Sequence, residues 1–386
     1  MKAWPKVALG ELLRRSDEAT VLDPAAEYHE VTIKLWGKGV VSRGKVRGGD
    51  VVSARRVVHA YQLILSKIDA RNGAIGLVPP ELDGAIVSND FPSFEFRDPE
   101  RCDAAFMGWL VRSAAFVELC KAASEGTTNR VRIKEDRFLD QQIGLPPLPE
   151  QQAIVARLDA LADKTREVEA HLDAVERDAE HLLALRFRDV VADAPLRPMA
   201  EVAPLVRREV SIDSEKIYTE LGVRSFYKGT FHRRTVPGAD FSWQDLYRIR
   251  AGDLVFSNIM AWEQAIAVAK AEDDGCVGNH RMLACEARPD IAIPGFLWYY
   301  FTTEEGFAKI YAASPGTAAR NRTMTAPALM AIEVPVPPLA AQQTFDRLQA
   351  DVAALKARHA VIRQANAALI PATLERIFST EDPAHA

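Results

Sequence analysis

Apolar residues follow two different periods along this chain, and each pattern occurs twice. After Leu145, and again after Val336, apolar residues recur alternately every four and every three positions. This heptad spacing is typical of a helix that packs along another helix. The stretches before these segments contain short β-branched runs bounded by Gly, Pro, Asn and Asp, which predict strands joined by tight turns. The sequence therefore predicts an α+β chain with two long helices.

The heptad positions define an expected seam along each helix. The first seam has one polar member, Thr165, and the second has His359 and Asn366, which we interpret as residues that set the helix register. At about 1.5 Å per residue, a helix of about 40 residues is about 60 Å long, so we expect each to act as a spacer. The large apolar seam residues are Ile154, Leu158, Leu161, Val168, Leu172, Val175, Leu182, Phe345, Leu348, Val352, Leu355, Ile362 and Leu369.

Prolines mark the expected start of both helices. The sequence is LPPLPEQQAIVARLDAL from Leu145 and VPPLAAQQTFDRLQADV from Val336. Proline holds the chain extended and is tolerated in the first helical turn, where its missing N–H costs nothing. Glu150 is expected in the first turn of its helix, where the helix dipole favours an acid. Alanines replace this acid and the preceding proline in the second copy.

The likeness between the two halves extends over the strand-rich stretches at a nearly constant shift. YHEVTIKLWGKGV from Tyr28 aligns with YTELGVRSFYKGT from Tyr218, LILSKI with LVFSNI, and SEGTTNR with SPGTAARNR. Each match is weak alone, but their common order indicates two copies of one unit. We expect strand-rich domains at residues 1–149 and 193–336, and long helices at residues 150–192 and 337–386.

Composition narrows the class of protein. The 386 residues are 48% hydrophobic and 26% charged, which is typical of a globular protein of two or three domains. No apolar run reaches the roughly 20 residues of a membrane span and no signal peptide is recognisable, so we expect a cytoplasmic protein. We interpret Cys102, Cys120, Cys276 and Cys285 as buried, reduced thiols, although the last two bracket His280, and we expect no metal and no cofactor.

Charge is distributed unevenly along the chain. The net charge is −5, yet residues 28–72 carry nine basic residues against three acidic ones, a local balance of +6. Residues 150–192 carry six basic residues against ten acidic ones, a balance of −4. The acidic charge therefore falls on the first long helix, and a basic surface is expected on the domain that precedes it.

These motifs resemble the specificity subunits of type I restriction-modification systems. The duplicated arrangement and the string LPPLPEQQAIVARLDAL before a heptad helix carry the resemblance, from which PPLAAQQ departs. The resemblance implies two repeated target recognition domains separated by two long antiparallel coiled-coil helices, without catalytic residues. The implied partners are double-stranded DNA, two DNA methyltransferase (modification) subunits and two restriction/translocase subunits. The implied function is recognition of a bipartite, asymmetric DNA target with a gap that the helices set.

Two alternatives remain open from the sequence. An enzyme has little support, because the chain contains no nucleotide-binding glycine motif, no Walker loop and no amino-methyltransferase tetrapeptide. A scaffold would bind protein partners through its coiled coil and would not bind DNA. The basic balance of the first domain argues against this scaffold.

Candidate DNA contacts follow from the chemistry of base and phosphate recognition. Arg pairs with guanine and Asn or Gln with adenine, whereas phosphates accept hydrogen bonds from Lys, Arg and short polar groups. Trp36, Phe226 and Tyr227 lie beside the basic clusters and are candidates for contact with a sugar or a thymine methyl group, but we interpret them as core residues because aromatic residues next to strands are usually buried. The expected DNA contacts are Lys38, Arg43, Lys45, Arg47, Ser53, Arg55, Arg56, Lys67, Arg71, Asn72, Thr127, Asn129, Arg130, Arg132 and Lys134 in the first domain, and Arg224, Lys228, Arg233, Arg234, Asn258, Asn279, His280, Arg281, Arg320, Asn321 and Arg322 in the second.

Overall fold

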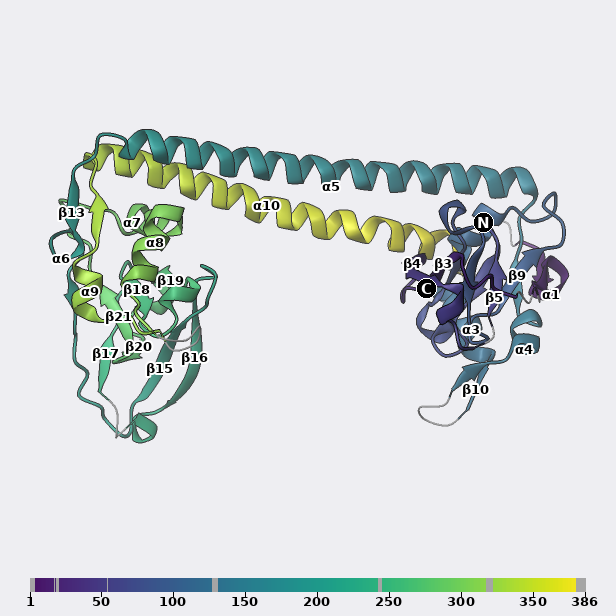
Figure 1. Cartoon of the computed structure of the whole chain (residues 1–386), viewed down its shortest axis with the longest axis horizontal. Helices are drawn as coiled ribbons and strands as arrows, with labels where there is room; N and C mark the ends of the chain where they lie inside the picture. The colour runs from purple at the N-terminus through teal and green to yellow at the C-terminus, as the bar shows by residue number, and fades with distance from the viewer. Residues whose placement is uncertain are drawn as a thin grey trace, which may run out of the picture. The chain divides into compact units, whose positions relative to one another are not determined.

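The computed structural model describes residues 4–16, 18, 21–53, 55–126, 131–241, 245–316 and 322–379. The chain forms two compact units. Unit 1 contains residues 1–172 and 360–386, and unit 2 contains residues 173–359. Each unit contains one strand-rich body and one section of both long helices (Figure 1).

The body of unit 1 contains two four-stranded sheets. The first has the order β4 (Val40–Arg47), β3 (Glu27–Ile33), β8 (Ala85–Val87), β5 (Arg56–Val58), and the second has the order β2 (Leu13–Ser16), β9 (Ser93–Phe96), β6 (Leu63–Leu65), β7 (Ile75–Leu77). Two further antiparallel pairs are β1 (Lys6–Ala8) with β12 (Gln142–Gly144), and β10 (Ser124–Glu125) with β11 (Arg132–Ile133). Three short 3-10 helices connect strands: η1 (Gly48–Asp50), η2 (Ala70–Asn72) and η3 (Pro80–Leu82).

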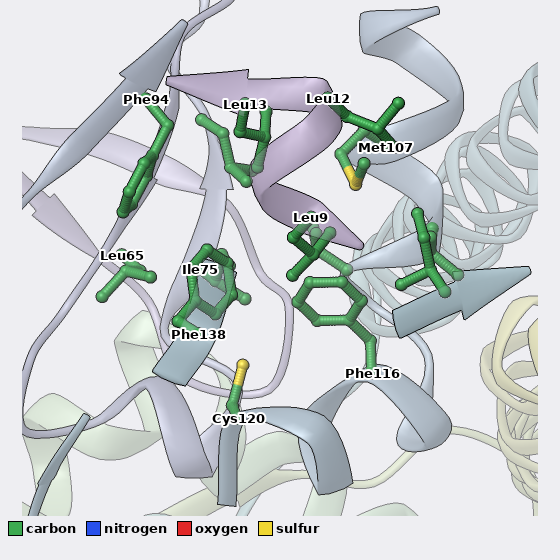
Figure 2. Packing of buried hydrophobic residues seen from close by; sticks show 14 of the residues in the cluster. Leu9, Leu12, Leu13, Leu65, Ile75, Phe94, Met107, Phe116, Cys120 and Phe138 are labelled. Atoms are coloured by element: carbon green, nitrogen blue, oxygen red, sulfur yellow. The ribbon is translucent and has the colours of Figure 1, made fainter. Parts of the chain in front are cut away.

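Short helices cover the second sheet of unit 1. They are α1 (Leu9–Leu12), α2 (Ala104–Leu110), α3 (Ala114–Ala122) and α4 (Glu135–Leu139). The side chains of Asp103 and Ser113 accept hydrogen bonds from the first-turn amides of α2 and α3, which explains where these helices begin. Large apolar side chains from the helices and the sheet fill one core, in which Phe94, Phe116 and Phe138 are fully buried (Figure 2).

Unit 2 repeats both four-stranded sheets of this arrangement and the antiparallel pair at the base of the long helix. Its sheets have the orders β16 (Thr230–Pro237), β15 (Ile217–Val223), β20 (Val277–Asn279), β17 (Leu246–Arg248), and β14 (Leu205–Val206), β21 (Met282–Cys285), β18 (Leu254–Ser257), β19 (Ile266–Val268). The remaining elements are β13 (Leu196–Pro198) paired with β22 (Glu333–Pro335), α6 (Met199–Val202), α7 (Pro294–Thr302), α8 (Glu304–Ala312), α9 (Ala326–Met330), η5 (Gly238–Phe241), η6 (Ala261–Glu263) and η7 (Ala271–Asp273).

Even an irregularity of the sheet is repeated. The β3–β4 pairing shifts register between Glu30 and Val31, and the β15–β16 pairing shifts between Glu220 and Leu221. The glutamate at this position also pairs in parallel with the next strand of its sheet, Glu30 with β8 and Glu220 with β20. The predicted duplication and the α+β class are therefore confirmed.

The two long helices are α5 (Leu148–Val191) and α10 (Leu339–Phe378), and they pack antiparallel in both units (Figure 1). In unit 1 the amide of Asn366 donates to the carbonyl of Thr165 at 3.0 Å and to Glu169 Oε1 at 2.9 Å. In unit 2 the ring of the buried His359 lies 2.8 Å from Glu176 Oε1. These two polar residues of α10 thus have fixed partners on α5.

The packed face of α5 differs from the expected seam. Leu158 and Leu172 are buried, as are Phe345 and Val352 on α10, and Ile154, Leu161, Val175, Leu348 and Leu355 are half-buried. Val168, Leu182, Ile362 and Leu369 are exposed. The packed face of α5 is shifted by one position from the expected seam, because Glu169 and Glu176 contact the polar residues of α10. With this shift, Leu183 and Phe187 pack into the core of unit 2. The spacing of apolar residues alone does not reveal that carboxylate side chains occupy positions on the packed face.

A buried glutamine joins each long helix to its body. In unit 1 the Gln151 amide donates to the carbonyls of Arg101 at 2.9 Å and Pro146 at 2.8 Å, and its oxygen accepts from the Asp103 backbone N–H at 2.9 Å. The side chain is fully buried, so these three bonds replace its water contacts. Glu150 adds a bond from the indole N–H of Trp4 at 3.1 Å.

The second joint has the same geometry despite its altered sequence. Gln342 donates to the carbonyls of Ile291 at 2.9 Å and Pro337 at 2.8 Å, and accepts from the Ile293 N–H at 3.0 Å. The change from PEQQ to AAQQ removes the acid that bonds the tryptophan in unit 1 but keeps this glutamine. The second helix is therefore held by the same three bonds as the first.

We predict that Gln151→Ala lowers the free energy of unfolding of unit 1 by about 1–3 kcal/mol, because backbone groups that it satisfies become unpaired. The neighbouring Gln152 is exposed, so Gln152→Ala is the matched control and should change stability by less than about 0.5 kcal/mol. Gln342→Ala and the exposed Gln343→Ala form the same comparison in unit 2. Urea unfolding measures all four; equal effects of the buried and exposed residues would contradict the joint.

Candidate nucleic-acid interface

An aromatic residue lies in the turn between β3 and β4 of unit 1 and in the equivalent turn between β15 and β16 of unit 2. In unit 1 the Trp36 backbone N–H donates to the Asn72 carbonyl at 3.0 Å, which docks the turn on η2. In unit 2 the Phe226 N–H donates to Glu263 in the same way at 2.9 Å. Trp36 is 72% exposed and Phe226 is 61% exposed. The expectation that these two residues belong to the core is wrong.

These aromatic residues also have an unusual backbone conformation. Trp36 has φ 62° and Phe226 has φ 60°, in the left-handed region that costs an L-residue roughly 1–2 kcal/mol. The hydrogen bonds of the turn to η2 and η6 hold this conformation in place. Strained backbone that presents an exposed ring at the same position of both repeats is typical of a binding site. Tyr227, the next residue, is half-buried and packs against Trp298, as expected for a core residue.

A row of cations follows the edge strand β4 in unit 1. Arg43, Lys45 and Arg47 are all exposed on this strand. Lys45 and Arg47 alternate and so share one face, whereas Arg43 lies in the bulge, where the pairing passes from Ser42 to Gly44. Lys45 lies 3.9 Å from Glu27 in an exposed ion pair, whereas Arg43 and Arg47 have no acidic partner among the described residues. An edge strand with unpaired cations repels other strands and attracts anions.

Other candidate cations are held by carboxylates. Arg55 pairs with Glu30 at 2.9 Å, Lys67 with Glu135 at 2.8 Å, and Arg132 with Asp90 at 2.9 Å. In unit 2 the buried Glu220 accepts from both Arg233 at 3.3 Å and Arg234 at 2.8 Å. Glu30 and Glu220 stand at equivalent bulge positions, so each repeat neutralises the same carboxylate with arginine. These arginines contribute less net positive charge than a count of basic residues indicates.

The β10–β11 pair brings a further group of candidates together. The Ile133 N–H donates to the Lys67 carbonyl, and the Lys67 N–H donates to the Asp90 carbonyl, both at 2.8 Å. In unit 2 the Met324 N–H donates to Asn258, whose own N–H donates to Arg281, again at 2.8 Å. Backbone hydrogen bonds therefore join the segments that carry Lys67 and Arg132 in unit 1, and those that carry Asn258 and Arg281 in unit 2. Thr127, Asn129, Arg130, Arg320 and Asn321 lie outside the described residues.

The remaining candidates have varied surroundings. Lys38, Ser53, Lys134, His280 and Arg281 are exposed. Arg56 donates to Asn89, Asn72 donates to Asp69, Asn279 accepts from the Arg281 N–H, and Arg71 is half-buried. Arg224, Lys228 and Arg322 lie over the rings of Phe231, Phe226 and Tyr311, respectively. Asn258 Oδ1 is buried without a hydrogen-bond partner, so this residue is poorly placed to reach a base directly.

The four cysteines are buried and free. Burial raises the pKa of the thiols of Cys102, Cys120 and Cys285 to about 12, so these residues stay protonated and unreactive at neutral pH. The described residues contain no group of three or more His, Cys, Asp or Glu side chains that could hold a metal ion.

Sequence reasoning missed Glu30, Glu220 and the two joint glutamines. Glu30 is one of only three acidic residues in the basic stretch 28–72, so its role was overlooked. Its alignment with Glu220 at the same position of both repeats is nevertheless visible in the sequence. Gln151 and Gln342 were quoted within the helix starts, but a glutamine there is usually exposed on sequence grounds. Only the repeated pair QQ gave a signal.

Comparison with known proteins agrees with this architecture. Residues 3–177 match the family model of the type I restriction modification DNA specificity domain. The fold is similar to the crystal structure of the HsdS subunit from Thermoanaerobacter tengcongensis, with a TM-score of 0.63 and 24% identity over 98% of this chain and 97% of that chain. It is also similar to a chain from a structure of a type I restriction-modification system described for its assembly and conformational transition, with a TM-score of 0.69 and 24% identity over 98% of both chains. No curated protein sequence matches this chain.

Two matching bodies, each joined to one of a pair of antiparallel helices, make up the fold that this chain shares with these two structures. The family match covers the first strand-rich body and most of α5, and the second body repeats the sheet order of the first. Within the described residues, every helix is too short or too polar to cross a lipid bilayer.

We predict that the double variant Arg43→Glu, Lys45→Glu loses at least about tenfold in affinity for duplex DNA and reduces the salt dependence by about two phosphate contacts. The control Lys6→Glu, Lys121→Glu makes the same change in net charge at exposed positions outside the β4 row. Fluorescence anisotropy at several salt concentrations measures both. Equal DNA affinity of the two variants would contradict the interface.

Proposed function

We propose that this chain is the specificity subunit of a type I restriction-modification complex and that it recognises a bipartite, asymmetric DNA target. The observation that carries the proposal is the repetition of one body with one joint and different surface side chains. Two related bodies suit two half-sites, as protein symmetry suits inverted sites in other DNA-binding proteins. Because the turns, edge strands and hairpins differ between the repeats, the two half-sites should differ in sequence.

The proposed DNA contacts are the exposed groups rather than the cations held by buried or half-buried carboxylates. Trp36 and Phe226 offer rings for sugars or thymine methyl groups, and the β4 cations offer phosphate contacts. The arginines that neutralise Glu30 and Glu220 then stabilise the body behind this surface. In this proposal, the exposed cations position the protein on the DNA backbone, and the turns recognise the bases.

The proposed protein partners are two methyltransferase subunits, with two restriction subunits in the full complex. The exposed apolar residues of the long helices support a protein partner, because Ile362 and Leu369 of unit 1 and Leu182 of unit 2 present apolar area to solvent. We also propose that the complex is cytoplasmic. The scaffold alternative would use these same helices but leaves the repeated exposed aromatic turns without a role.

The gap between the half-sites is proposed to depend on the length of α5 and α10. Removing residues 173–179 and 356–362 deletes one heptad from each helix where they face one another, so packing register is kept. Each helix becomes about 10 Å shorter, which corresponds to about three base pairs.

We predict that methylation sequencing of cells with this shortened chain and its methyltransferase shows a changed gap and unchanged half-sites. A variant with one heptad inserted in each helix at the same place is the matched control, and it should change the gap in the opposite direction. An unaltered gap in both variants would overturn the spacer role while leaving DNA recognition intact.

A further inference from the structure

Unit 1 contains a hollow at a place where its repeat carries two aromatic side chains. It has a volume of about 360 Å³ and lies between the β3–β4 turn, β7 and α2. Glycines form much of its wall, among them Gly37 and Gly108, and Trp109 and Leu77 add apolar surface. Lys38 and Arg112 bring two cations to it, and its lining contains no acidic residue.

The equivalent space in unit 2 is filled by two aromatic side chains. Tyr227 stands where unit 1 has Gly37, and Trp298 stands where it has Gly108, because both turns and both helices align at a shift of 190. The two rings pack edge to face with centroids 6.3 Å apart. The Tyr227 hydroxyl donates to the Phe301 carbonyl at 2.7 Å, so the ring is anchored at its far end.

Neighbouring residues have changed size in the opposite sense. A Cβ atom on Gly108 would lie 2.7 Å from Leu77 Cδ1, and one on Gly37 would lie 3.1 Å from the Arg112 side chain. Unit 2 has the smaller Val268 and Thr302 at these two positions. Four positions therefore differ together. Unit 2 fills the space with two of its own aromatic side chains, whereas unit 1 leaves the space open and has larger side chains beside it.

The rim of the hollow carries charge that an occupant can use. The Arg112 guanidinium lies 4.2 Å from the centroid of the Trp109 ring, and the Trp109 indole N–H donates to Asp159 on α5 at 2.9 Å. This stack fixes the arginine beside the hollow and ties the site to the long helix. Among the described residues, Arg112 has no carboxylate partner, so an anion from outside would complete it.

We propose that the hollow of unit 1 binds an aromatic side chain flanked by a carboxylate, supplied by the methyltransferase subunit that docks on this unit. The ring would occupy the space that Tyr227 fills in unit 2, and the carboxylate would pair with Arg112 and Lys38. A protein side chain fits better than a DNA base, since a base must first be unstacked and unpaired at a cost of a few kcal/mol. This inference rests on the proposed function, because it assigns the partner of that complex to a site.

The test introduces the two aromatic residues that fill this space in unit 2 at the equivalent positions of unit 1. The variant Gly37→Tyr, Leu77→Val, Gly108→Trp, Arg112→Thr carries the unit 2 residue at all four positions of the first repeat. Thermal unfolding establishes whether this variant folds. Native mass spectrometry and calorimetry then follow titration with the methyltransferase subunit in the absence of DNA. We expect the tighter binding step to weaken at least about tenfold, as for loss of an aromatic anchor at an interface.

Single substitutions keep the test decisive if the filled variant is unstable. Arg112→Ala and Lys38→Ala leave the hollow open and should each weaken the same step several-fold. Lys228→Ala removes the counterpart of Lys38 in the unit whose space is filled, so it is the matched control and should leave binding unchanged. Full affinity in both Arg112→Ala and Lys38→Ala would overturn the proposal.

The outcomes also separate this site from the proposed function. If the wild-type chain does not bind the methyltransferase at all, the proposed function fails. If it binds and the filled variant binds equally well, only the aromatic site fails. If the filled variant assembles normally but loses affinity for duplex DNA, the hollow accepts a base and the protein side chain is the wrong occupant.

Discussion

A buried glutamine side chain holds each long helix to its strand-rich body, and the rest of the structure depends on this joint. Gln151 and Gln342 each bond two carbonyls and one backbone N–H, which link the proline segment, the loop before a short helix and the start of the long helix. A buried amide with all of these bonds tolerates little rotation, because breaking any one leaves a polar group unpaired. A helix fixed in this way can serve as a spacer, whereas a loosely joined helix cannot define a distance.

Duplication kept this internal frame and let the surface diverge. Sheet order, the bulge at Glu30 and Glu220 and the exposed aromatic in the equivalent turn recur in both units. The residues that face solvent or partners differ, as the pair Gly37 and Tyr227 shows. Such a division suits a protein whose two halves carry out the same task on different targets. It also allows one half to present a site that the other half closes.

Periodicity and self-similarity predicted most of the fold. The repeated helix starts and the constant shift required no knowledge of side-chain contacts, and the duplicated α+β architecture follows from them. The seam was shifted at Val168 and Leu182 because Glu169 and Glu176 occupy the packed face through hydrogen bonds to Asn366 and His359. Trp36 was assigned to the core because aromatic residues beside strands are usually buried; a left-handed turn, which hydrophobicity does not encode, turns it outward.

Single-molecule methylation sequencing of a host that carries this chain with its methyltransferase tests the central claim most directly. The structure of two joined, non-identical repeats predicts methylation at one motif made of two different half-sites separated by a gap of constant length. Replacing residues 27–96 with the equivalent stretch of unit 2 should make the two half-sites alike. A contiguous motif, or a methylation pattern that is unchanged when the chain is removed, would contradict the account.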